Sequence, residues 1–382
     1  MADAQVAAAP EGSNKVMLAC YVAMFTLWGL AQVVLIPVPV NLISMSTIII
    51  YVGAHRSLRL RDKAHPDNAE SETLSKEDAM KFPLVGSATL FGLYMLFKLL
   101  DKDMVNLVLS VYFSGMGALT LAGTFDPLVH VVVKSETLYG RKFNLPWVGE
   151  VDLTFTPSGL VSLAFGLAFG AVYFQTKHWT MNNILGISFC VQALERISLG
   201  SYKIGAILLV GLFFYDIFWV FGTEVMVTVA KSFDGPIKLV FPRKFGNPLA
   251  DPPIKAEFSM LGLGDIVIPG LFVALLLRYD AHSAGASPAL RDLAAFAKPF
   301  FHTNIVAYVL GLVATMVVMY QFDAAQPALL YLVPACLVAS LVPALARKEF
   351  GALLAYSEED EEKAEEKADG KPVAGADAKK TK

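Results

Sequence analysis

Two aspartates stand in segments where an aspartate is costly. Asp216 lies in the apolar run 204–222, and Asp265 lies in the apolar run 261–279. Both runs are long enough to cross a membrane as helices, which takes about 20 apolar residues. An aspartate at the centre of such a helix costs roughly 2.5–3.5 kcal/mol on insertion scales. Two of them that can face each other suggest an acid–base pair that works inside a membrane.

The two aspartates are expected at matching depths. Asp216 comes six residues before Gly222, where its span ends, and Asp265 comes four residues after Leu261, where the next span begins. Because these spans are consecutive, the two ends lie on the same side of the membrane. A helix rises about 1.5 Å per residue, so both carboxyls are expected about 6–9 Å from that face. The match holds whichever way up the protein inserts.

Matched depth permits contact, and contact between two carboxyls permits chemistry. Two carboxylates about 3 Å apart cannot both ionise, so the pair holds one proton. The ionised member can take a proton from water, and the protonated member can give one to a peptide carbonyl. This acid–base arrangement is that of aspartic proteolysis, and it needs no metal.

The residues beside the aspartates are compatible with a site that a second chain approaches. Gly262 and Gly264 precede Asp265, and glycine lets another backbone come close. Close helix–helix packing is the alternative interpretation, since small residues are common at membrane interfaces. Tyr215 could position Asp216 through a hydrogen bond or simply pack, and the sequence does not separate these roles.

A third element is expected at the same level. The stretch Gln326–Leu329 reads Gln-Pro-Ala-Leu and begins the last apolar run, on the same face as the start of the Asp265 run. Proline in the first turn is a good helix start, so a plain helix beginning is the alternative. Two other Pro-Ala-Leu tripeptides begin at Pro288 and Pro343, but only Pro327 has the depth of the aspartates.

Composition indicates a membrane protein that crosses the bilayer many times. Hydrophobic residues make up 55% of the 382 residues and charged residues 17%, whereas a soluble domain carries about 25% charge. Nine runs are candidate spans: 39–55, 83–100, 104–123, 157–175, 181–199, 204–222, 261–279, 301–320 and 327–346. The sequence therefore predicts an all-α polytopic fold with nine transmembrane helices. A tenth run at 17–36 is a signal-like segment, an extra span or an extension of the first.

The side chains show no metal, thiol or nucleic-acid chemistry. Cys20, Cys190 and Cys336 are isolated in apolar runs and are interpreted as buried small residues. Three cysteines without a CxxC pattern give neither a disulfide framework nor a metal signature. The six histidines are scattered and form no HExxH pair. Basic residues form no single patch, so we expect no cofactor and no nucleic acid.

The loops and the tail predict an orientation. Six basic residues between 56 and 81 place that loop in the cytosol, which makes the amino terminus luminal and the carboxyl terminus cytosolic. The 223–260 connection, with five basic residues, argues the opposite; the first loop carries more weight because it is short and follows the earliest span. Residues 351–382 are predicted to be a disordered charged tail. Lys379 and Lys380 near its end match a dilysine signal for return to the endoplasmic reticulum.

The predicted organisation has four parts: an N-terminal segment at 1–38, N-terminal transmembrane helices at 39–200, catalytic transmembrane helices at 201–350 and the tail at 351–382.

The combined motifs resemble the intramembrane aspartyl proteases of the presenilin and signal peptide peptidase family. The motifs are Tyr215-Asp216, Gly262-Leu263-Gly264-Asp265 and Gln326-Pro327-Ala328-Leu329, and further matching runs cover 220–233, 236–242 and 329–335. The resemblance implies a presenilin-like fold of nine spans with Asp216 and Asp265 as the catalytic pair. It also implies that the other motif residues shape the active site and place the substrate.

The resemblance further implies substrates and a location. Expected substrates are membrane-spanning remnants of signal peptides and type II membrane protein segments, cleaved in the endoplasmic reticulum membrane. Membrane lipids and a second copy of the chain are further candidate partners.

Two functions from other classes remain as alternatives. Intramembrane aspartates also mark proton relays, so a proton or ion transporter is the first alternative. A catalytically silent chaperone or receptor that keeps the motifs for binding is the second.

Overall fold

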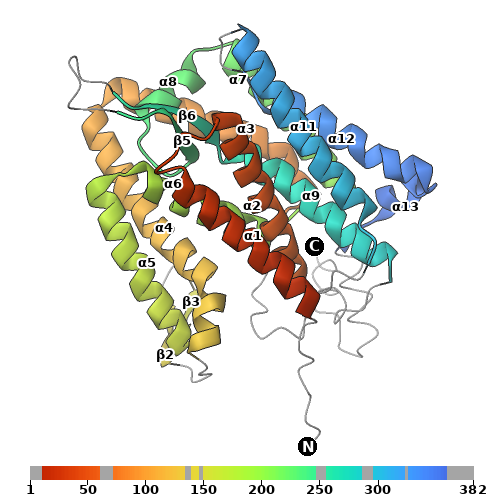
Figure 1. Ribbon diagram of the computed structural model, residues 1–382, viewed down its shortest axis with the longest axis horizontal. Helices are drawn as coiled ribbons and strands as arrows, with labels where there is room; N and C mark the ends of the chain where they lie inside the picture. The colour runs from red at the N-terminus through yellow and green to blue at the C-terminus, as the bar shows by residue number, and fades with distance from the viewer. Residues whose placement is uncertain are drawn as a thin grey trace, which may run out of the picture.

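The computed structural model describes residues 11–60, 72–133, 139–145, 149–246, 255–285, 296–322 and 326–358. Within these ranges the chain is mostly helical (Figure 1). The helices are α1 Glu11–Leu30, α2 Val38–Leu60, α3 Lys76–Leu99, α4 Lys102–Val132, α5 Pro157–Thr176, α6 Trp179–Arg196, α7 Tyr202–Phe221, α8 Val225–Ser232, α9 Gly264–Ser283, α11 Pro299–Phe322, α12 Leu329–Ala346 and α13 Phe350–Ala355. The strands are β1 Glu72–Thr73, β2 Tyr139–Leu145, β3 Gly149–Phe155, β4 Ile197–Ser198, β5 Lys238–Lys244 and β6 Glu257–Gly262.

Seven of these helices are long and apolar enough to cross a membrane: α2, α3, α4, α5, α7, α11 and α12. The prediction of a polytopic membrane protein is therefore confirmed. The other two predicted spans, 181–199 and 261–279, also fall on helices, α6 and α9, but these are not among the seven.

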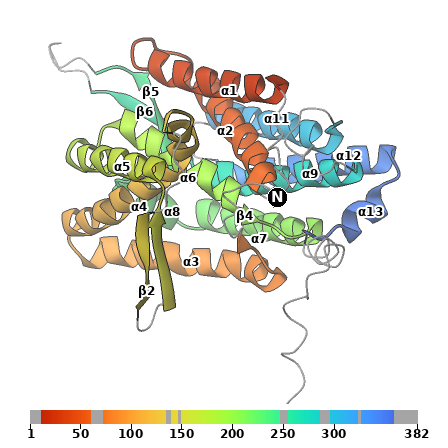
Figure 2. The same cartoon turned by 90° about the horizontal axis from the view of Figure 1, so that it is seen from below.

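Helix α9 lies inside the bundle and is surrounded by protein. It contacts α2, α6, α7, α11 and α12 (Figure 2). Every residue from Pro269 to Ala281 is buried, including Arg278 and Asp280. Charged groups at membrane depth are tolerated where they face the bundle interior and find partners, so this helix can carry polar residues that a lipid-facing helix could not.

The all-α prediction needs correction in the segment before Asp265. Strands β5 and β6 pair antiparallel, with Lys238 opposite Gly262 and Val240 opposite Met260. The predicted helix start at Leu261 was wrong, because β6 continues to Gly262 and α9 begins at Gly264. Alternate residues of a strand face opposite sides, and β5 uses this to bury its Leu239 and Phe241 side chains in the core.

The apolar run 17–36 forms a helix of its own. α1 ends at Leu30, the chain turns, and α2 begins at Val38, so the run does not extend the first span. α1 packs against α2. The indole Nε1 of Trp28 also donates to the Thr180 carbonyl at the start of α6, over 3.1 Å.

The first residues of the predicted tail, 351–358, fold against the bundle. Helix α13 covers Phe350–Ala355, and Leu353, Tyr356 and Glu358 are buried. These side chains find contacts in the bundle, which gives the segment the burial that a disordered tail lacks. Residues 359–382, with Lys379 and Lys380, lie outside the described residues.

Candidate active site

Asp216 lies near the end of α7 and is only 3% exposed. Its Oδ2 accepts a hydrogen bond of 3.1 Å from the backbone amide of Leu329, the first residue of α12. Pro327 and Ala328, just before that helix, are also buried. The structure therefore brings the Pro-Ala-Leu stretch directly to the Asp216 carboxyl.

Asp265 is the second residue of α9 and is half-buried. Its carboxyl is near enough to Asp216 for the two to interact electrostatically. The hydroxyl of Tyr308, from α11, donates to the Asp265 backbone carbonyl over 3.3 Å. The start of α9 is thus held from α11, and its first turn carries the Asp265 carboxyl.

The two glycines before Asp265 have different surroundings. A Cβ atom added at Gly262 would lie 3.3 Å from Asp265 Oδ2, whereas one at Gly264 would meet nothing within 4 Å. Leu263 between them packs against α6, where a Cβ at Gly186 would lie 3.4 Å from its Cδ2. The missing side chain at Gly262 leaves space for the Asp265 carboxyl. Gly264 is exposed, so within the described residues no side chain covers the backbone directly before Asp265.

Tyr215 and Gln326 make local contacts. The Tyr215 ring lies 6.3 Å from the Trp219 ring and packs toward Gly86 of α3. Within the described residues its hydroxyl makes no hydrogen bond to Asp216, so its contacts are those of packing. Gln326 Oε1 accepts from the Tyr331 hydroxyl over 3.3 Å, at the entry to α12.

Sequence reasoning missed two asparagines that hold the β5–β6 hairpin. Asn183 of α6 is fully buried; its Nδ2 donates to the Val240 carbonyl over 2.7 Å, and its Oδ1 accepts from the Val240 amide over 2.8 Å. Asn182 Nδ2 donates to the Lys238 carbonyl over 2.8 Å. Two adjacent carboxamides in an apolar run were the available signal.

Lys238 fastens the same hairpin to α8. Its Nζ donates to the carbonyls of Ala230 and Phe233, over 2.9 and 3.2 Å. Burial lowers the pKa of Lys238, and the negative charge of Asp234 partly opposes this shift. The ammonium thus satisfies carbonyls at the end of α8 that lack partners within that helix.

The profile of the family described as signal peptide peptidase matches residues 66–360, which include both aspartates. This chain belongs to the signal peptide peptidase family. It is 42% identical over 328 residues to a mouse protein named signal peptide peptidase, with 83% of this chain and 82% of that protein covered. The human protein of that name is 41% identical over 329 residues, with the same coverage. A Caenorhabditis elegans protein named intramembrane protease 2 is 50% identical over 190 residues, 48% of this chain and 39% of its own.

Membership of the signal peptide peptidase family confirms the predicted enzyme class, an intramembrane aspartic protease. The family resemblance was carried by three short motifs, and the structure brings residues from all three to one place: Asp216, Asp265 and Leu329.

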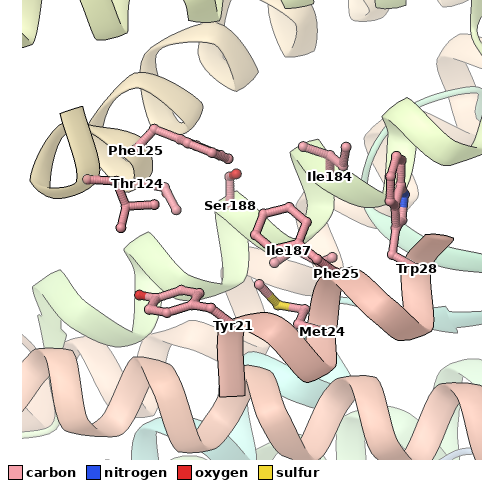
Figure 3. A pocket seen from close by; sticks show the side chains of 10 residues that line it. Tyr21, Met24, Phe25, Trp28, Thr124, Phe125, Ile184, Ile187 and Ser188 are labelled. Carbon is pink, nitrogen blue, oxygen red and sulfur yellow. The ribbon is translucent and has the colours of Figure 1, made fainter. Parts of the chain in front are cut away.

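One further hollow lies away from these motifs. α1, α4 and α6 line a small apolar crevice (Figure 3). Tyr21, Met24 and Trp28 of α1 face Phe125 of α4 and Ile187 of α6 across it. Neither aspartate lines this crevice, so it is separate from the candidate active site.

Proposed function

We propose that this chain is an endopeptidase that hydrolyses peptide bonds within transmembrane helices, with Asp216 and Asp265 as a dyad that activates water. Its substrates are mainly remnant signal peptides and type II membrane segments. The observation that carries the proposal is the convergence of α7, α9 and α12, where the Leu329 amide donates to Asp216 and the charge of Asp216 acts on the Asp265 carboxyl.

The chemistry follows from one shared proton. The ionised carboxyl removes a proton from a water molecule as its oxygen attacks the scissile carbonyl, and the protonated carboxyl donates to the carbonyl oxygen. Proton return to the leaving nitrogen then breaks the C–N bond. Peptide dipoles support both acids: the Leu329 amide donates to Asp216, and Asp265 stands in the first turn of α9, the positive end of that helix.

The substrate must unwind before its carbonyls can react. A transmembrane helix satisfies its carbonyls internally, because lipid offers no partner. The β5–β6 hairpin supplies an alternative partner. Since the polar backbone groups of Val240 bind Asn183, those of the opposing Met260 point away from β5. An extended substrate segment can pair with this edge of β6, which leads through Gly262 to Asp265.

The topology completes the proposal. α2 to α7, α9, α11 and α12 form the nine spans in the endoplasmic reticulum membrane, with a luminal segment before α2 and a cytosolic tail. Lys379 and Lys380 act there as the retrieval signal. α1 packs on this unit as an additional apolar helix.

One reconstitution separates the proposal from its alternatives. The wild-type protein is placed in vesicles containing a pH-sensitive dye and given two helical peptides, one all-Leu and one interrupted by Gly and Asn. We expect the interrupted peptide to be cleaved faster, without proton flux. Proton flux without cleavage indicates a transporter, and peptide binding without either indicates a silent receptor. Equal cleavage rates for the two peptides contradict the unwinding step.

A further inference from the structure

The first residues after α13 are locked into the bundle. Glu358 is 1% exposed, and its Oε1 accepts from Arg278 Nε over 2.5 Å. The Ser198 hydroxyl donates to the other carboxylate oxygen of Glu358. We refer to Tyr356–Glu358 as the tail clamp.

The clamp meets three parts of the bundle through one charge pair. Arg278 lies on α9 and is 5% exposed. Its Nη1 donates to the Ser57 hydroxyl of α2 over 2.6 Å, and its Nη2 to the Ser198 hydroxyl of β4 over 3.4 Å. Buried charges persist where partners and hydrogen bonds satisfy them, and here Glu358 supplies the opposite charge.

Backbone contacts fix the clamp along the chain. The Glu358 amide donates to the Gly200 carbonyl over 2.8 Å, and Ser357 forms an antiparallel bridge with Ser201. Ser201 is the N-cap residue of α7. The Tyr356 ring lies 5.3 Å from the Tyr279 ring of α9. The clamp therefore binds the beginning of α7 and the end of α9 at once.

These are the two helices that carry the aspartates. Asp216 follows Ser201 by about 15 residues and Arg278 follows Asp265 by about 13, so each carboxyl lies roughly 20 Å along its helix from the clamp. α7 and α9 run in opposite directions between these ends. Because the tail clamp binds the beginning of α7 and the end of α9, it fixes the position of α9 relative to α7 along their common axis.

We propose that Glu358 is a positioning residue for the dyad: through Arg278 and the Ser198–Ser201 segment it sets the axial register of α9 against α7, and hence of Asp265 against Asp216. This inference rests on the proposed function. A misplacement of about 1 Å can cost about 100-fold in rate, so a register change too small to unfold the protein is enough to lower turnover.

The test compares Glu358→Gln with Glu77→Gln in the full-length protein in vesicles. Glu77 forms an exposed pair with Lys81 on α3 and serves as the matched control. We expect Glu358→Gln to lower kcat per folded molecule about tenfold or more with KM within about twofold, and Glu77→Gln to leave both unchanged. Ser198→Ala, which keeps the ion pair but loses one hydroxyl, is expected to give a smaller loss and serves where Glu358→Gln does not fold.

A second readout needs no catalysis. In a chain with its three native cysteines replaced by alanine, Asp216→Cys and Asp265→Cys are joined by a short thiol-specific cross-linker, with and without Glu358→Gln or Ser198→Ala. A slower cross-linking rate in folded protein is expected. Unchanged kcat per folded molecule together with an unchanged rate overturns the clamp proposal. Failure of the proposed function is recognised separately, as wild-type protein that cleaves nothing while the cross-linking rate still responds to the clamp.

Discussion

The Leu329 amide donates a hydrogen bond of 3.1 Å to Asp216 Oδ2, although 113 residues separate the two along the chain. The donor is available because Leu329 is the first residue of α12, where backbone amides have no partner within the helix. The contact gives the Pro-Ala-Leu stretch a physical role. α12 begins at its leucine, so the unpaired amide of that residue meets the Asp216 carboxyl.

This hydrogen bond can be removed without altering a side chain. Replacing Leu329 by its α-hydroxy acid converts the amide to an ester and deletes only the N–H. A hydrogen bond to a charged group contributes roughly 1.5–3 kcal/mol, so kcat should fall about tenfold or more. The same replacement at Leu330, whose amide donates to the Pro327 carbonyl, is the control. Equal effects at the two positions would refute a specific role for the Leu329 amide.

The glycines before Asp265 should respond differently to alanine. In Gly262→Ala the new methyl lies 3.3 Å from Asp265 Oδ2, so the carboxyl must shift by a few tenths of an ångström and kcat should fall severalfold. In Gly264→Ala the methyl meets no protein atom within 4 Å. Any loss of activity in Gly264→Ala must therefore come from contact between the new methyl and the substrate, and it should appear as a raised KM. Steady-state kinetics on both variants checks this, and the reverse pattern would contradict the geometry.

Asn183 should be important for stability. Asn183→Ala leaves the amide and carbonyl of the half-buried Val240 without their partner, and an unsatisfied buried group costs roughly 1–3 kcal/mol. Asn182→Ala withdraws a donor from one strand carbonyl, that of Lys238, and should cost less. Thermal unfolding in detergent measures both. A Tm for Asn183→Ala at or above that of Asn182→Ala would argue against Asn183 as the main support of β5.

The close contact of α4 and α5 gives a second stability prediction. A Cβ at Gly166 would lie 2.2 Å from the Ala118 carbonyl oxygen, a backbone atom that cannot rotate away. Gly166→Ala should therefore push the helices apart and cost roughly 1–3 kcal/mol. Gly115→Ala on α4, where a Cβ meets nothing within 4 Å, should stay within about 0.5 kcal/mol of wild type. Denaturant titration in detergent compares them, and equal stability of the two variants would show that the helices adjust freely.

The helices were predictable because each is a long apolar run between polar or proline-containing stretches. The expected depth of Asp265 was counted from a helix start at Leu261, but α9 begins at Gly264, so the matched depth of the two aspartates stays a prediction. The β5–β6 hairpin before Asp265 was not predictable in this way. β5 contains Pro242 and a register shift. The backbone of its Val240 pairs with the side chain of Asn183 on α6, which lies 57 residues earlier in the chain. A contact of this kind leaves no periodic pattern.

Glu358 shows the same limit at the tail. It begins an acidic run that composition assigns to solvent, but its partner Arg278 stands 80 residues earlier inside a buried helix. Only the fold brings this charge pair together. The predicted roles of Tyr215, Gly262, Gly264 and the Gln326–Leu329 stretch in substrate placement stay predictions.

The most direct measurement is the rate of peptide cleavage by purified protein in vesicles, for wild type, Asp216→Asn, Asp265→Asn and Asp103→Asn. Asp103 is an exposed aspartate in the first turn of α4 and controls for the loss of a carboxylate. Since general acid–base catalysis contributes about 100- to 10,000-fold, each dyad variant should lose at least about 100-fold, and Asp103→Asn should match wild type. Cleavage at the wild-type rate by folded Asp216→Asn or Asp265→Asn protein would contradict the dyad.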